Sequence, residues 1–156
     1  MNNPYQSPAS QVVSEHAVLA LQYGGFWRRV GASIIDTMLI LLITSPVLYF
    51  LYGASVFTEQ AGTHGPLEFV ISYIFPAVAS ITFWIYRSAT PGKMMLGLKI
   101  VDADSGGPCT TGQLIGRYLG YYVSILVAGL GFIWVAFDKR KQGWHDKLAG
   151  TLVIRS

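Results

Sequence analysis

The fold is decided by residues 30–52, which read VGASIIDTMLILLITSPVLYFLY. These 23 residues would form a helix of roughly 34 Å at about 1.5 Å per residue, enough to cross a hydrocarbon core of about 30 Å. Phe26 and Trp27 precede the run and Tyr49 and Tyr52 close it, as the aromatic belts of a membrane helix do. The stretch therefore predicts a membrane-spanning helix.

Two further apolar runs follow along the chain. Residues 67–86 are apolar apart from Glu68 at their edge, with Pro76 placed to kink a helix. Residues 114–137 are also apolar, except for Arg117 near their start. We therefore expect an all-α polytopic membrane protein with helices at about 30–52, 67–86 and 114–137.

Charge predicts how these runs are oriented. None of the 11 Lys and Arg residues falls within residues 30–86, so the 53–66 loop is expected outside and residues 1–29 and 87–112 in the cytoplasm. The C-terminal segment is also basic, which requires the third run to enter and leave on one side. Twenty-four residues are too few for two spans, so we expect a re-entrant or interfacial hairpin turning near Gly129 and Gly131. A single third span with the C-terminus outside is the alternative.

Outside the apolar runs the chain has two kinds of segment. Residues 1–22 offer little apolar surface and predict a flexible tail, leaving 23–156 as the membrane domain. A β-hairpin is expected over residues 98–110, and β-prone residues 151–154 are expected to pair with it in a small cytoplasmic sheet.

Composition argues against several functional classes. Hydrophobic residues make up 52% of the chain and charged residues 12%, against about 25% charged in soluble domains. The net charge of +3 is not arranged as a basic stripe with aromatics, so no nucleic acid is expected as a partner. Cys109 has no metal-ligand companions, and no nucleotide loop or catalytic triad stands out, so we expect no cofactor, no metal and no enzymatic activity.

Asp36 is the most informative residue, because an ionisable side chain inside an apolar span is costly. It could be a proton- or cation-binding carboxylate facing a polar cavity, or a packing partner of Arg29, Arg117 or Lys93. Arg29 lies two helical turns earlier on the same face. Arg117 lies at a similar depth if the third run inserts from the cytoplasmic side. We expect Asp36 to face protein, with Arg29 or Arg117 within salt-bridge or water-bridged reach.

Two short motifs flank the apolar runs. Thr90-Pro91-Gly92-Lys93 follows the second run and predicts a turn at the membrane surface, where Lys93 could reach a lipid phosphate or Asp36. His145-Asp146 could relay protons in principle, but Asp146 is more simply a helix cap or a partner of a basic residue.

Taken together, several strings resemble the RDD family of membrane proteins. They are Gly25-Phe26-Trp27-Arg28-Arg29 leading into Ile35-Asp36, Thr90-Pro91-Gly92-Lys93-Met94, Asp138-Lys139-Arg140, and His145-Asp146-Lys147-Leu148-Ala149-Gly150-Thr151. The family is named for one arginine and two aspartates. The resemblance assigns Arg29 and Asp36 to two of these, and Asp146, or alternatively Asp138, to the third. It implies a multi-pass protein of a bacterial inner membrane with a cytoplasmic N-terminus, and transport has been suggested for the family.

Two functions are therefore expected to compete. One is a component of ion or small-solute transport with Asp36 as its proton or cation site, which requires a homo-oligomer or another membrane protein to enclose a pathway. The other is a non-transporting scaffold or assembly partner, with Gly31, Ala32 and Ser33 as close helix contacts. Both place the chain in the lipid bilayer.

Overall fold

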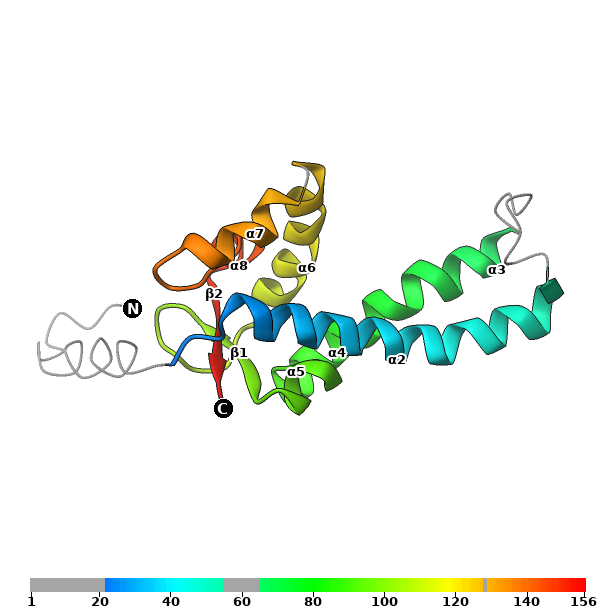
Figure 1. Ribbon diagram of the computed structural model, residues 1–156, viewed down its shortest axis with the longest axis horizontal. Coiled ribbons are helices and arrows are strands. Elements are labelled where there is room, and N and C mark those ends of the chain that lie inside the picture. Colours follow the sequence, from blue (N-terminus) through cyan, green and yellow to red (C-terminus); the bar gives the residue numbers. More distant parts are fainter. Residues whose placement is uncertain (1–21, 55–64, 128) are drawn as a thin grey trace, which may run out of the picture.

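The computed structural model describes residues 22–54, 65–127 and 129–156 (Figure 1). The chain is mainly helical with one small two-stranded sheet, as the sequence predicts. The expected tail, apart from residue 22, and most of the expected outer loop lie outside the described residues.

Two long apolar helices form one end of the molecule. Helix α2 (Phe26–Tyr52) starts four residues before the apolar run, because Arg28 and Arg29 are included in its first turn. The second run is nearly continuous, from α3 (Pro66–Phe69) through the π-helix η2 (Val70–Ile74) to α4 (Phe75–Arg87). The wider π turn precedes Pro76, which has no backbone N–H to donate to the preceding turn.

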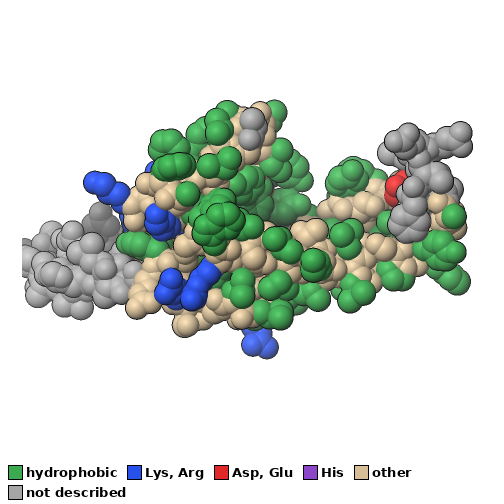
Figure 2. Space-filling view, viewed as in Figure 1, with side chains coloured by type: hydrophobic (Ala, Val, Ile, Leu, Met, Phe, Trp, Pro, Cys, Tyr) green, Lys and Arg blue, Asp and Glu red, His purple; other side chains and the backbone are tan. Residues whose placement is uncertain are grey.

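These two helices are long and apolar enough to cross a membrane. Figure 2 shows hydrophobic side chains along the two long helices, while the visible Lys and Arg side chains gather toward the other end of the molecule. This separation fits a bilayer around the two-helix end.

The third apolar run is bent rather than straight. Helix α6 (Thr111–Leu126) and helix α7 (Leu130–Phe137) meet at 100°, with Gly129 in the left-handed conformation at the N-terminus of α7 (φ 73°). The predicted turn near Gly129 is therefore confirmed. By length and composition the bent pair fits either a broken third span or a re-entrant loop.

The sheet joins distant parts of the chain. Strand β1 (Leu98–Asp102) pairs antiparallel with β2 (Thr151–Arg155), with Ile100 opposite Val153, so the predicted pairing is confirmed. Residues Gln22 to Gly24 extend the sheet, since Tyr23 forms a bridge with Ile154 and the Gly24 amide donates to the Val153 carbonyl (2.8 Å).

The predicted hairpin over residues 98–110 is wrong, because only its first half forms a strand. The Asp102 carboxylate accepts hydrogen bonds from the amides of Asp104 and Ser105, which turns the chain out of the sheet. Thr110 and Gln113 then form a capping box, and α6 begins at Thr111 instead of near residue 114.

The buried core lies at the basic end, between the sheet and the helices. Its apolar cluster combines β1 and β2 residues with Trp84 of α4, Leu114 of α6 and Ala32 of α2; the strand members are Leu98, Ile100 and Val153. The short helices α5 (Pro91–Met95) and α8 (Trp144–Leu148) pack against α2 and α6 respectively. This end positions all the candidate site residues.

Candidate functional site: a polar cleft at the basic end

Asp146 is the centre of a buried ion cluster. Its two carboxylate oxygens form ion pairs with Arg29 of α2 and Arg117 of α6, and Asp146 and Arg117 are almost completely buried. The Gly143 amide donates a further hydrogen bond to Asp146 (2.9 Å). Burial would raise the pKa of Asp146, but the Arg117 and Arg29 charges hold that pKa well below its usual range. Asp146 is therefore an ionised link between α2, α6 and α8.

The two arginines are held in place by further acceptors. Arg29 donates from Nε to the Gly24 carbonyl (2.9 Å) and from Nη2 to the Lys141 carbonyl (2.6 Å). Arg117 donates from Nη1 to Thr151 Oγ1 (2.8 Å). These contacts direct both guanidinium groups toward the sheet and the C-terminal segment.

Asp36 is held by a different segment. Its Oδ1 accepts a hydrogen bond from the backbone amide of Gly92 (2.7 Å), and its Oδ2 accepts one from the hydroxyl of Thr90 (2.5 Å). A direct salt bridge between Asp36 and Arg29 or Arg117 is not formed among the described residues, because both arginines form their ion pairs with Asp146. The water-bridged contact that the sequence also allowed stays a prediction. The physical reason is reach: Asp36 lies about 10.5 Å of helix rise from Arg29, while the turn before α5 supplies donors directly beside it.

Gly92 allows α5 to pack directly on α2. A Cβ atom at this position would lie 2.3 Å from the Ala32 carbonyl oxygen and 2.9 Å from Asp36 Oδ1. Pro91 occupies the first turn of α5, where its missing N–H costs no hydrogen bond. Pro91, Gly92 and Lys93 thus begin a short helix that packs on α2, and their expected place at the membrane surface stays a prediction.

Lys93 is buried beside Trp84. Only 7% of the residue is exposed, and its Nζ lies 5.7 Å from the centre of a Trp84 ring and 3.5 Å from Thr90 Oγ1. The Arg117 guanidinium lies 5.6 Å from the centre of a Trp84 ring as well. Two cations therefore share one indole, at which cation–π attraction offsets part of the cost of their burial.

His145, next to Asp146, packs among aromatic rings instead of facing solvent. Its ring centroid lies 4.6 Å from that of Tyr121 and 5.0 Å from that of Phe132, and Nδ1 is 3.4 Å from Ser124 Oγ. Burial lowers the pKa of His145 to about 3, although the Asp146 charge opposes this shift. The His145 imidazole is therefore neutral at neutral pH and packs against the neighbouring rings.

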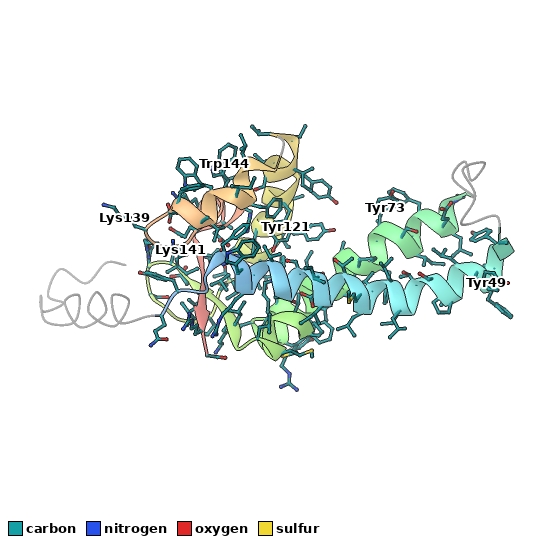
Figure 3. The ribbon with its side chains drawn as sticks, in the orientation of Figure 1. Tyr49, Tyr73, Tyr121, Lys139, Lys141 and Trp144 are labelled. Carbon is teal, nitrogen blue, oxygen red and sulfur yellow. The ribbon has the colours of Figure 1, made fainter. Side chains whose placement is uncertain are left out.

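The arginines that pair with Asp146 and the group around Asp36 line one cleft of about 740 Å³, between α2, α4 and the α6–α7 pair. Figure 3 places Tyr121 where α6 faces α2. Besides apolar side chains, the walls carry the polar or charged groups Arg29, Ser33, Asp36, Thr37, Ser80, Thr90, Lys93, Arg117, Tyr121 and His145. The cleft therefore combines an apolar wall with a charged floor.

Sequence reasoning found the charged residues but missed their neighbours. Trp84 and Tyr121 were not singled out as site residues, although Tyr121 follows Arg117 by one helical turn and so had to share its face. Asp138 lies outside the cleft, where it pairs with Lys147 (2.5 Å) and caps the loop amides of Arg140 and Gln142. Within the described ranges, no three His, Cys, Asp or Glu residues are grouped as a metal site would require.

Comparison with known proteins agrees with this architecture. The family model described as the RDD family matches residues 23–150. The uncharacterised protein YxaI of Bacillus subtilis is 33% identical over 148 residues, covering 83% of this chain and 95% of YxaI. The uncharacterised membrane protein YteJ of the same organism is 29% identical, covering 90% of this chain and 85% of YteJ.

A third relative matches a shorter part of the chain with higher identity. An uncharacterised protein of Rickettsia prowazekii is 43% identical over 76 residues, which are 49% of this chain and 42% of that protein. No solved structure matches the chain. The family match over most of the chain, the two membrane-length helices and the arginine–aspartate clusters lead to one conclusion: the chain belongs to the RDD family of membrane proteins.

Proposed function

We propose that the protein is a component of ion or small-solute transport in a bacterial inner membrane and that Asp36 is its proton- or cation-binding group. The observation that carries this proposal is the position of Asp36, a carboxylate on an otherwise apolar span that lines a cleft. Ionisable side chains within a span commonly mark ion pathways or proton relays.

The hydrogen bonds of Asp36 support this role. Thr90 and Gly92 supply one donor to each carboxylate oxygen, and a carboxylate has about four lone-pair positions. Asp36 can therefore accept a proton or a cation without giving up either contact. Asp146 differs, because two arginines and the Gly143 amide already surround it.

A pathway across the bilayer needs more than one chain. The described residues contain two membrane-length helices, or three if the bent pair counts as one span, which are too few to enclose a route alone. We propose that homo-oligomers, or a complex with another membrane protein, complete the pathway. The mass of the purified protein in mild detergent, measured by light scattering, tests the oligomer.

The scaffold alternative has less support from the contacts. Ala32, expected to face another protein, is fully buried, and its carbonyl meets Gly92 of the same chain. Ala32 thus serves packing within the fold, whereas Ser33 lines the cleft.

The test is cation-linked proton flux in liposomes containing the purified protein, under an imposed sodium or potassium gradient. Asp36→Asn removes the charge but keeps groups that can satisfy Thr90 and Gly92, so the fold should survive. Asp104→Asn, in an exposed turn, is the matched control. We expect flux with the native protein and the control, and no flux with Asp36→Asn.

Two results would contradict the proposal. One is flux no greater than in empty liposomes under every gradient. The other is a well-folded Asp36→Asn protein with native flux. A variant that only loses stability, with flux per folded molecule unchanged, would make Asp36 a structural residue and not the ion site.

A further inference from the structure

The charge balance around the cleft is positive. Arg29, Lys93 and Arg117 contribute three positive charges, whereas Asp36 and Asp146 contribute two negative ones. Asp146 is shared by both arginines, and the described residues contain no carboxylate within 4 Å of Lys93. Thr90 links Lys93 to a carboxylate indirectly, because its hydroxyl accepts a hydrogen bond from Lys93 and donates one to Asp36.

Hydrogen-bond donors are also in excess here. Arg117 Nε and Trp84 Nε1 are buried without an acceptor among the residues that the structure describes. Lys93 has one recorded hydrogen bond within the described part of the chain, at 3.5 Å. All three groups gather around the same Trp84 side chain. Buried donors short of acceptors are costly, so at Lys93 a ligand that brings acceptor oxygens and negative charge would be favoured.

The apolar wall of the cleft indicates which other chemical group such an anionic ligand would carry. Ile34, Met38 and Leu41 of α2 line the cleft and are each about half exposed or more. They continue from the charged floor along the apolar helix, in the direction of the hydrocarbon core. A ligand that fits both parts has an anionic head and an apolar tail.

We propose that the cleft binds an anionic phospholipid, with its phosphate against Lys93 and its acyl chain along Ile34, Met38 and Leu41. Basic pockets between membrane helices on the cytoplasmic side commonly bind anionic headgroups. The site goes beyond the proposed transport role, because it requires no titration or ion binding at Asp36. Lys93 makes the direct contact, while the charge of Arg117 adds to the positive potential of the floor and the Trp84 ring lies beside both cations.

The experiment is a titration of the full-length protein in mild detergent with short-chain phosphatidylglycerol, followed by calorimetry. Phosphatidylcholine of the same chain length and inorganic phosphate are titrated in parallel. We expect saturable binding of phosphatidylglycerol, at least tenfold tighter than of phosphatidylcholine, and no measurable binding of inorganic phosphate. Equal affinity for the two lipids would overturn the proposal, and so would phosphate binding as tightly as the lipid.

Variants locate the site. Lys93→Met should weaken phosphatidylglycerol binding about fivefold or more, since each lysine near an anionic headgroup contributes about that factor. Lys99→Met, on an exposed part of β1, removes the same charge outside the cleft and should change affinity less than twofold. Lys93→Arg keeps the charge and should retain binding. Equal losses in Lys93→Met and Lys99→Met would place the lipid elsewhere.

The lipid site and the transport role fail separately. If Lys93→Met does not fold, the headgroup comparison on the native protein still decides the proposal. Phosphatidylglycerol binding without flux would remove the transport role and keep the lipid site. Flux without headgroup preference would do the reverse.

Discussion

At the scale of single residues, two aspartates have different environments: Asp36 on the first span and Asp146 in the C-terminal segment. Asp146 forms ion pairs with two guanidinium groups, while Asp36 accepts hydrogen bonds from one hydroxyl and one amide. A carboxylate that balances buried cations is structural, because its removal leaves those charges unpaired. A carboxylate held by neutral donors can change its charge at lower cost.

Asp146→Asn should therefore destabilise the fold strongly. Leaving Arg29 and Arg117 without a counter-charge is expected to cost about 3–5 kcal/mol of unfolding free energy. Denaturant unfolding in mild detergent measures the loss. Asp138→Asn is the control: its partner Lys147 is 44% exposed, so the expected cost is at most about 1 kcal/mol. Equal effects of the two substitutions would contradict the assigned roles.

His145 makes stability depend on pH. The unfolded chain binds a proton at this residue near pH 6.5, whereas burial lowers the pKa to about 3 in the folded protein. Between these values the unfolded state binds more protons, so stability should fall as the pH drops below about 6.5, by at most about 1.4 kcal/mol per pH unit. Thermal unfolding from pH 8 to pH 5 tests this. In His145→Gln the dependence should be flatter, and an unchanged profile would refute the assignment.

At the scale of elements, the contact between α5 and α2 depends on one missing side chain. Gly92→Ala would place Cβ 2.3 Å from the Ala32 carbonyl oxygen, so α5 must move away and the Asp36 hydrogen bonds must lengthen. We expect a loss of about 1–3 kcal/mol or more. Gly116→Ala in α6 meets no atom within 4 Å and should be neutral or stabilising by up to about 1 kcal/mol. Similar unfolding midpoints for the two variants would contradict this packing.

The bent α6–α7 pair has both ends tied to the C-terminal end of β1 or to the residue that follows it. At its start, Gln113 donates to Asp102 (2.5 Å), and after its end Arg140 donates to the Ala103 carbonyl (2.5 Å). Such ties favour a re-entrant hairpin over a third span, because a span would carry its two ends to opposite sides of the bilayer.

Reporter fusions test this element directly. A compartment reporter inserted at residue 60 and one fused to Ser156 should report opposite sides, with Ser156 in the cytoplasm. Both reporters on one side would instead establish three complete spans.

The sequence predicted the elements better than it predicted the contacts. Helix length, the bend near Gly129 and the β1–β2 pairing follow from hydropathy, glycine and β-propensity, which are local properties. The partners of Asp36 do not, because they depend on α5 folding back onto α2, a contact between residues 56 positions apart. The second strand of the predicted hairpin is absent from the described residues 103–110, where the Asp102 carboxylate turns the chain.

At the scale of the whole molecule, apolar and polar surface are separated. Side chains of α2 and of α3 to α4 face outward along the membrane-length end, while the ion clusters, the sheet and the cleft occupy the other end (Figures 1 and 2). The charged cleft thus lies where the spans begin, at the depth of the lipid headgroups. With the basic end in the cytoplasm, as the positive-inside rule predicts, the cleft also borders cytoplasmic water.

The central claim is that this cleft is open to water and ligand, and thiol accessibility tests it most directly. In a Cys109→Ser background, Ser33→Cys places a thiol on the cleft wall, and Ile35→Cys places one at nearly the same depth outside the lining. A water-soluble, membrane-impermeant thiosulfonate added from the cytoplasmic side should modify position 33 at least tenfold faster than position 35. Equal rates at the two positions, or no reaction at position 33, would contradict the account.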